Sequence, residues 1–543
     1  MANSQLIGSI LAKTRKAFAF SLDTLAPPKA QGYLRDTRSG VIASRPAVLR
    51  EHRDEIRRVW DRTAALAMDM IQNSGRLKGA CDQIIADTVG TELTLNPQPD
   101  LTRLGYNDAE RRDFITLVKT DWKQWAWNRR ECDVRGKLTV PQQADVGIRY
   151  WIAFGESLPM VTHLSDADQA RYGLSTSTKM LMVPPTRLVR DTQEALGLYQ
   201  GVFHDENGRA TAYRFRYRKN GMFVTEDKPA YDTFGQQLVE HIFDPMDATD
   251  VRGISLLAPT FRRYIQHEML DDATLQTFIL QTLYAVTLTS EAPSADAFEA
   301  LEVLKDASPA NASAFVDDFA QYLKARMDRA LESRINVSAD PTVSHLAPGE
   351  DLNFKKASTP GGEYLPFSDS LSRDTARAMG ITFGGLTMNY TNATYSSVRM
   401  ETSSLWPVVL RRRERIAAPH YQMAYENWLD EQIFTGSIPF KGGYEAFAAN
   451  RDRVCWALWQ GPAKPTADDQ KSAKASSERI INGTTTLAHE CAELGLDPDE
   501  VFEQRKLEHD RYIAAGLPSP FERGMPSDPV IQDEQPKSQG TSA

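Results

Sequence analysis

Residues 140–255 are dense in strand and turn signals, whereas the segments on both sides follow helical spacing, and this contrast constrains the fold most. Asn207-Gly208 and Asn220-Gly221 each separate two strand-like runs, and such dipeptides favour the tight turns of β-hairpins. The strands are expected in RYWIAFGESLPMVTHL, TKMLMVPP, ENGRATAYRFRY and KNGMFV. The sequence therefore predicts a helix-rich α+β fold.

Outside this section, apolar residues recur three or four positions apart, as in amphipathic helices. The clearest predicted helix covers 256–288, where Pro259 is tolerated in the first turn. A helix from Tyr395 toward Ile433 would be about 60 Å long at 1.5 Å per residue. Pro407 and Pro419 lie inside it and predict kinks or breaks. Further helices are predicted over 46–70, 108–131, 312–334 and 367–380, with at least two more in 467–515.

Length and composition bound the class of protein. A chain of 543 residues allows about three or four domains, and no apolar run approaches the ~18–20 residues that span a bilayer. The four cysteines are far apart and lack zinc-ligand spacing, which predicts reduced, buried thiols and fits a reducing cytoplasm. The net charge of −9 does not suit a protein that wraps DNA.

A search for catalytic and ligand-binding motifs finds almost nothing. The sequence has no P-loop for nucleotide hydrolysis and no GxSxG, HExxH or GxGxxG motif. His241 stands in apolar company and is expected to be a satisfied, semi-buried histidine, and Asp271-Asp272 is expected on a solvated helix face. We therefore predict no catalytic residue, no cofactor and no metal site, which argues against an enzyme with a familiar cofactor.

The strongest basic cluster consists of Arg411, Arg412, Arg413 and Arg415. Four arginines within a turn and a half of helix would repel one another, so acidic partners from a neighbouring chain are plausible. A solvated or intersubunit helix face is favoured over a DNA contact.

Several segments, taken in order, resemble the lambda-type phage portal family. They lie between about residues 60 and 435, and each motif alone is weak, so their common order carries the resemblance. They are NSGRLKGACDQIIADTVGTELTL, DWKQWAWNRRECDVRGKLTV followed by Gly155-Glu156, EHIFDPMDATDVRGISLLAPTFRRY, LAPGEDLNF and LSRDTARAMGITFGGLTMNYTNATYSSVRM. The densest part of the match is TMNYTNATYSS, whereas DATDVRG lacks a glutamine expected before its arginine.

The resemblance implies a ring of subunits, commonly twelve, at one vertex of a capsid, through which double-stranded DNA is packaged and ejected. It implies as partners the terminase large subunit, capsid or scaffold proteins and a head–tail connector, with no membrane. The terminase hydrolyses ATP, which agrees with the missing P-loop. The protein would be part of the virion and would assemble in the cytoplasm of a bacterial host.

The resemblance also implies a division of the chain into portal parts. Residues 1–45 would form an arm, 46–255 an α+β wing, and 256–288 and 367–380 two stem helices around a clip at 289–366. A tunnel loop at 381–394 would face DNA. A long kinked helix and wing return would cover 395–465, a helical crown 466–515 and a disordered tail 516–543.

The predicted tunnel loop, ITFGGLTMNYTNAT, contains no charged residue. Duplex DNA presents one charge per ~1.7 Å of axis, so a wall that neutralised many phosphates would bind tightly and stall the DNA. Neutral groups can make single hydrogen bonds worth a net ~1 kcal/mol each. We expect the glycines to let the loop flex. The predicted channel residues are Gly384, Gly385, Thr387, Asn389, Tyr390, Thr391 and Asn392.

Two other functions remain open at this level. The chain could be a tail or baseplate adaptor, or a hydrolase of unfamiliar type that uses some of its many carboxylates. An uncharged loop between helices is also simply a loop, so the DNA assignment depends on the resemblance.

Overall fold

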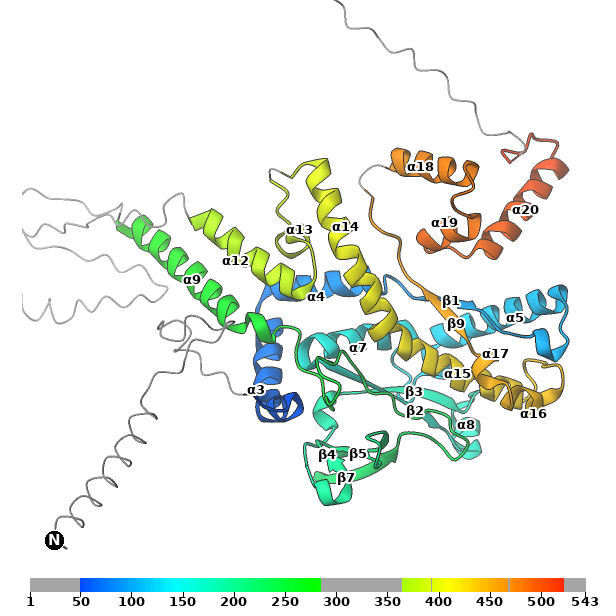
Figure 1. Ribbon diagram of the computed structural model, residues 1–543, viewed down its shortest axis with the longest axis horizontal. Coiled ribbons are helices and arrows are strands. Elements are labelled where there is room, and N and C mark those ends of the chain that lie inside the picture. Colours follow the sequence, from blue (N-terminus) through cyan, green and yellow to red (C-terminus); the bar gives the residue numbers. More distant parts are fainter. Residues whose placement is uncertain (1–48, 285–363, 392, 467–468, 522–543) are drawn as a thin grey trace, which may run out of the picture. The chain divides into compact units, whose positions relative to one another are not determined.

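The structure is a computed structural model, and it describes residues 49–284, 364–391, 393–466 and 469–521 (Figure 1). Residues 56–543 form one unit and residues 1–55 another, of which only the last seven are described. The predicted arm, the predicted helix at 312–334, nearly all of the predicted clip and most of the predicted tail lie outside the described residues.

Side-chain caps fix the ends of the helices in the first part of the chain. Ser74 accepts a hydrogen bond from Leu77 N at the start of α4, and Asn107 and Thr139 form capping boxes at α5 and α7. The helices are α3 (His52–Asn73), α4 (Gly75–Thr88), α5 (Asp108–Trp127), α6 (Arg129–Cys132), α7 (Val140–Phe154) and α8 (Asp166–Tyr172). Short 3-10 turns lie at Thr102–Leu104, Pro185–Arg187, Glu194–Leu196 and Ala258–Thr260.

The strands form three small antiparallel sheets, ordered β3-β2-β8, β4-β5-β6-β7 and β1-β9. Asn207-Gly208 lies between β5 and β6, and Asn220-Gly221 joins β6 to β7 with positive φ at both residues. Both predicted hairpin turns are therefore confirmed. The strand expected in RYWIAFGESLPMVTHL starts only at Glu156, because its first six residues are the last turns of α7, so that part of the prediction is wrong. The strands are β1 (Thr94–Pro97), β2 (Glu156–His163), β3 (Thr178–Val183), β4 (Leu198–Tyr199), β5 (Val202–His204), β6 (Ala210–Lys219), β7 (Met222–Pro229), β8 (Ile242–Phe243) and β9 (Ala457–Gln460).

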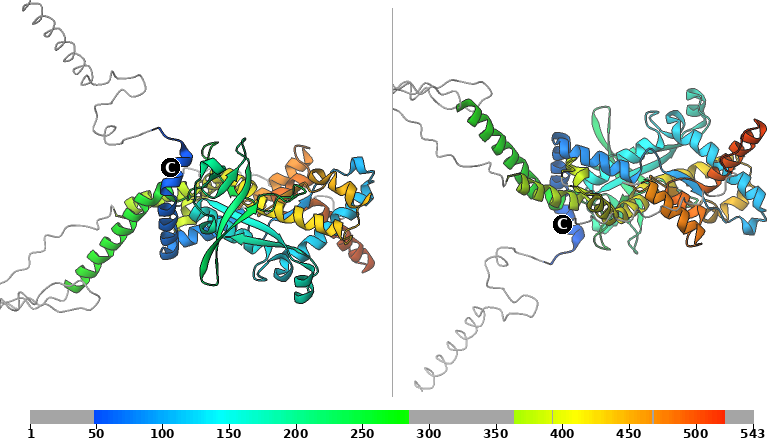
Figure 2. Two further views of the ribbon diagram at one scale, coloured as in Figure 1. Left: turned by 90° about the horizontal axis from the view of Figure 1, so that it is seen from below. Right: turned by 90° about the horizontal axis from the view of Figure 1, so that it is seen from above.

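The remaining helices include α9 and α12, the two helices predicted as a pair, which lie side by side (Figures 1 and 2). The long helix predicted from Tyr395 is divided by a π-helical turn at Arg413–Ala417, directly before Pro419 in the first turn of α15. The predicted break is confirmed there, whereas α14 continues through Pro407. These helices are α9 (Phe261–Tyr284), α12 (Tyr364–Met379), α13 (Phe383–Thr387), α14 (Tyr395–Arg412), α15 (Ala418–Phe434), α16 (Gly443–Ala448), α17 (Arg451–Val454), α18 (Asp469–Ile481), α19 (Leu487–Glu493) and α20 (Pro498–Ala514).

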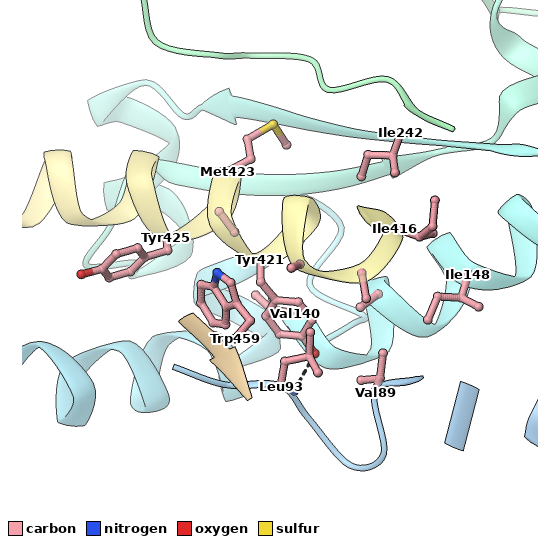
Figure 3. Packing of buried hydrophobic residues seen from close by; sticks show 14 of the residues in the cluster. Val89, Leu93, Val140, Ile148, Ile242, Ile416, Tyr421, Met423, Tyr425 and Trp459 are labelled. Atoms are coloured by element: carbon pink, nitrogen blue, oxygen red, sulfur yellow. Dashed lines mark hydrogen bonds between the residues drawn. The ribbon is translucent and has the colours of Figure 1, made fainter. Parts of the chain in front are cut away.

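The largest hydrophobic core surrounds α15, which is buried on most of its circumference. The Trp122 ring lies 5.5 Å from that of Trp428 and 5.8 Å from that of Trp459, centroid to centroid. Leu93 N donates a hydrogen bond of 3.4 Å to Tyr421 Oη inside this core (Figure 3). Each aromatic pair adds ~0.5–1.5 kcal/mol to the burial of its apolar area, so the tryptophans join α5, α15 and β9 into one body.

The four cysteines are buried free thiols, as predicted. Burial raises the pKa of Cys81 to about 11 and that of Cys132 to about 12, which keeps both protonated and unreactive at neutral pH. In the described part of the chain, no helix has the length and apolar character needed to cross a membrane.

Candidate DNA-channel segment

The predicted channel residues lie between α12 and α14. Gly380 ends α12 with φ +66°, a left-handed conformation that favours glycine. Thr382 then caps the short helix α13 by accepting a hydrogen bond of 2.9 Å from Gly385 N. Phe383 N donates to Glu401 Oε1 of α14 at 2.6 Å, so the start of α13 is fixed to the helix that follows it.

The structure corrects the expectation that 381–394 is one flexible loop. Gly384, Gly385 and Thr387 belong to α13, and Gly384 is buried. A Cβ added to Gly384 would lie 2.5 Å from Cε1 of Tyr390, so this glycine permits close packing of the tyrosine ring. The two glycines lie in an N-capped helical turn and not in an open loop, which removes the reason for expecting them to let the segment flex.

The exposed part of the segment is the turn that follows α13. Met388 adopts φ 54°, Asn389 accepts a hydrogen bond of 3.0 Å from Thr391 N, and Ala393 N donates to Tyr390 O at 3.0 Å. Thr394 then forms a capping box at the start of α14. Met388 and Tyr390 are 73% and 56% exposed, and Asn389 and Thr391 are exposed as well, whereas Asn392 lies outside the described residues. From 378 to 398 the sequence contains no charged residue, so the exposed side chains of the turn are uncharged.

Two arginines of the basic cluster bond to the helix ends next to this segment. Arg412 is 5% exposed and donates from Nη2 to Met379 O at 2.9 Å, at the C-terminal end of α12 where a cation is favoured. Arg413 is also buried and donates to Thr88 O at 3.0 Å and to Pro462 O at 2.9 Å. The prediction of partners from a neighbouring chain is therefore wrong for Arg412 and Arg413, because both guanidinium groups are used inside their own chain.

The other two arginines of the cluster are nearer the surface. Arg411 donates to both carboxylate oxygens of Asp244 at 2.7 Å, within its own chain. Arg415 is exposed. An intersubunit role remains a prediction for Arg411 and Arg415.

Burial is the largest cause of the pKa shifts of Arg412 and Asp87, which lie next to the channel segment. It lowers the pKa of Arg412 to about 10, and the negative charge of Asp87 opposes the effect. Burial also raises the pKa of Asp87, against a hydrogen bond from Gln83 and the charges of both arginines. The Arg412 guanidinium lies 5.2 Å from the centre of the Trp151 ring, a cation–π contact that partly replaces lost hydration.

A second buried ionic cluster fixes the segment that leads into α9. Arg252 donates from Nε to Glu156 Oε2 at 2.8 Å and also hydrogen-bonds Oε1, while His241 Nε2 lies 2.8 Å from Oε2. Glu156 and Arg252 are at most 1% exposed. The surrounding charges hold the pKa of the Glu156 carboxyl at about 2 in spite of its burial. The prediction that His241 is a satisfied, semi-buried histidine is confirmed.

A third polar cluster joins α4, α9 and α12. His267 Nε2 lies 2.7 Å from Ser368 Oγ, its Nδ1 lies 3.1 Å from Arg76 Nη1, and Asp271 accepts from Tyr364 Oη at 2.6 Å. Asp271 is half-buried and bonded in this cluster, whereas the neighbouring Asp272 is exposed, so the predicted solvated face holds for Asp272 and in part for Asp271. In a Ser-His-Asp triad the carboxylate orients Nδ1–H, whereas an arginine faces Nδ1 here, so this arrangement is not a nucleophilic triad.

Sequence reasoning missed the roles of Arg412, Glu156 and Arg252. The sequence does hold a signal for buried charges of this kind, namely a charged residue next to a glycine or a strongly apolar segment, as in Gly155-Glu156 and Arg252-Gly253. Within the described residues, no group of three or more histidine, cysteine, aspartate or glutamate side chains is arranged to hold a metal ion.

A family model and two curated relatives that match the chain all represent phage portal proteins. The model of a family described as "Phage portal protein, lambda family" matches residues 38–413. The portal protein of Escherichia phage N15 is 26% identical over 490 residues, which cover 86% of this chain and 88% of that protein. Portal protein B of Escherichia phage lambda is also 26% identical, over 492 residues with the same shares covered.

Solved structures similar to the chain come from the necks of GTA particles. A chain from the neck of an empty particle has a TM-score of 0.34 and 12% identity, and the match covers 83% of this chain and 94% of that one. A chain from the neck of a native particle has a TM-score of 0.30 and 10% identity, with 74% and 96% covered.

Proposed function

Because the chain belongs to the lambda family of phage portal proteins, we propose that its copies form a ring at one capsid vertex and that duplex DNA passes through the ring. The ring contains about a dozen copies related by rotation, each presenting one surface to a different surface of the next. The protein is a structural part of the virion and catalyses no reaction in this role.

The observation that carries the DNA path is the exposed, uncharged turn formed by residues 388–391 and 393–394, which follows the capped helix α13. Its threonine, asparagine and tyrosine groups offer single hydrogen bonds worth a net ~1 kcal/mol each to a passing phosphate. Such contacts are similar at every step of translocation, because they do not depend on base sequence. The acid excess of the chain, with a net charge of −9, repels DNA from the walls over the ~8 Å screening length at physiological salt.

The support of the turn suits this role. Gly384 packs under Tyr390, Phe383 N is bonded to Glu401, and Arg412 ties the end of α12 to the π-helical turn. A loop held at both ends keeps the same position in every subunit of a ring. A channel of constant width follows from that repetition.

The other partners follow from the proposed role. The terminase large subunit and later a head–tail connector dock on one end of the ring, and capsid or scaffold proteins surround the ring. Assembly takes place in the host cytoplasm. The 60.8 kDa chain would thereby supply geometry, while the separate terminase supplies ATP hydrolysis.

Two measurements test the proposal. Native mass spectrometry should give a species of about twelve times the 60.8 kDa chain mass, and negative-stain images should show a central hole wide enough for duplex DNA. A purified chain that remains a monomer under all assembly conditions contradicts the ring.

The DNA path is tested by Asn389→Lys with Asn392→Lys. Rings should form normally but package DNA slowly or not at all, because each subunit would then bind phosphates through two charges. The matched control is Gln470→Lys with Ser472→Lys on the exposed face of α18, which adds the same charge elsewhere. Normal packaging by the Asn389/Asn392 variant removes the channel assignment.

A further inference from the structure

The β6–β7 hairpin has one face in a core and one face in solvent. Tyr213 and Phe215 of β6 belong to a hydrophobic cluster, together with Val202 of β5. Since neighbouring residues of a strand point to opposite faces, Arg214, Arg216 and Arg218 lie on the other face of β6. Their partners across the hairpin are Asp227, Thr225 and Phe223, respectively. The outer face of the hairpin therefore presents a line of three arginines.

Positive charge is concentrated here although the chain as a whole is acidic. Residues 209–228 contain six lysines and arginines against two acidic residues, in a chain of net charge −9. Arg214 is paired with Asp227 at 2.7 Å. In the described part of the chain, no carboxylate lies within ion-pair distance of Arg216, Arg218 or Lys219, and all three side chains are exposed. This face therefore has uncompensated charge.

Aromatic rings orient two of the guanidinium groups. Arg214 lies over Phe203 at 4.9 Å and Arg216 over Phe223 at 5.0 Å from the ring centre. A ring contact uses the flat face of the guanidinium, so the N–H edge of Arg216 is left free to donate, whereas that of Arg214 is bonded to both carboxylate oxygens of Asp227. Phe223 is 69% exposed and β7 is exposed along most of its length, so nothing in the described unit covers this edge of the sheet.

Arg190 lies close enough to Arg216 to be affected by its charge. Burial lowers the pKa of Arg190, the charges of Arg252 and Arg216 act in the same direction, and Asp191 opposes them. Arg190 is itself paired with Asp61, so it adds no uncompensated charge to the hairpin.

We infer that the outer face of the β6–β7 hairpin binds the phosphate backbone of duplex DNA outside the channel. Alternate residues of a strand are ~6.6–6.8 Å apart, so the three arginines form a regular row that can follow consecutive phosphates. Duplex DNA offers such anions continuously, at one per ~1.7 Å of axis, and the guanidinium fork matches phosphate geometry. A folded acidic protein surface would have to supply carboxylates in a row of matching spacing, which is a narrower requirement. The inference is independent of the channel and does not require a ring.

Covalently closed circular duplex DNA is the probe, because it cannot thread the channel and reports only on outer surfaces. Contact with three or four phosphates predicts a slope of about −3 in log K against log salt, or a ~40- to 150-fold loss of affinity between 50 and 200 mM salt. Arg216→Glu with Arg218→Glu should weaken plasmid binding at least ~10-fold. Arg216→Lys with Arg218→Lys, which keeps the charge, should retain most of the affinity.

The control is Arg111→Glu with Arg112→Glu on the exposed face of α5, which changes the net charge equally. It should leave the affinity within about twofold. Equal losses in the two glutamate variants, or unchanged binding by the hairpin variant, would overturn the inference. So would a hairpin variant that binds plasmid normally but no longer forms rings, because the face would then be a subunit interface. Ring formation is measured separately by mass, so its failure is distinguishable from failure of plasmid binding.

Discussion

Replacing Glu156 by glutamine should destabilise the protein by several kcal/mol and remove part of its acid sensitivity. Glu156 is the only carboxylate bonded to buried Arg252 among the described residues, so Glu156→Gln leaves a guanidinium uncompensated in the core. Breaking a buried pair on one side typically costs ~3–5 kcal/mol. The fall of the Glu156 pKa from 4.5 to about 2 gives a similar figure, roughly 3 kcal/mol at ~1.4 kcal/mol per pKa unit.

The same shift fixes the direction of the pH effect. A carboxyl whose pKa is depressed on folding stabilises the protein fully above its unfolded pKa, and the contribution is lost as the pH falls toward the folded value. The wild-type protein should therefore lose about 3 kcal/mol from this residue between roughly pH 5 and pH 2. In the glutamine variant that contribution is absent at every pH, so the difference between the two proteins should shrink on acidification.

Urea unfolding at pH 7 and pH 3, followed by tryptophan fluorescence, measures both effects. Arg252→Met is the matched variant, and the double variant should be more stable than either single one, since it buries no unpaired charge. A pH 7 difference below ~0.5 kcal/mol between wild type and Glu156→Gln would refute the reasoning, as would fully additive effects of the two substitutions.

Three further predictions concern two closely packed glycines and one buried carboxyl group. Gly384→Ala should lower stability by at most ~1 kcal/mol, because the exposed Tyr390 ring can turn away from the new Cβ, and adding Tyr390→Ala should recover the loss in thermal melts. Gly155→Ala places a Cβ 2.2 Å from the Ile254 backbone at φ +84°, so soluble yield should collapse, whereas Gly173→Ala, also at positive φ but in open space, should cost only ~1 kcal/mol. Burial and the neighbouring Glu426 raise the pKa of Glu240 to about 7, so stability is lost as the pH rises through that value. Glu240→Gln should therefore raise the melting temperature at pH 8 and have little effect at pH 4; an equal gain at both pH values would contradict this.

The turns and helix ends that depend only on neighbouring residues were determined by the sequence alone. The turns at Asn207-Gly208 and Asn220-Gly221 form because few residues other than glycine and asparagine adopt positive φ at low cost, and this preference is legible without tertiary contacts. The helix α9 (Phe261–Tyr284), which lies inside the predicted range 256–288, and the break before Pro419 are local properties of the same kind. The family, too, was recognisable from the order of short motifs along the chain.

Only the tertiary structure decided which face of each element is buried and which partner each charge receives. Arg412 and Arg413 look like a surface cluster in the sequence, yet the π-helical turn and the ends of α12 and α4 bury both of them. Gly384 reads as a flexible hinge, yet a ring six residues further along the chain makes it a packing position. Burial and long-range pairing depend on residues far apart in the chain, so spacing along the chain does not specify them.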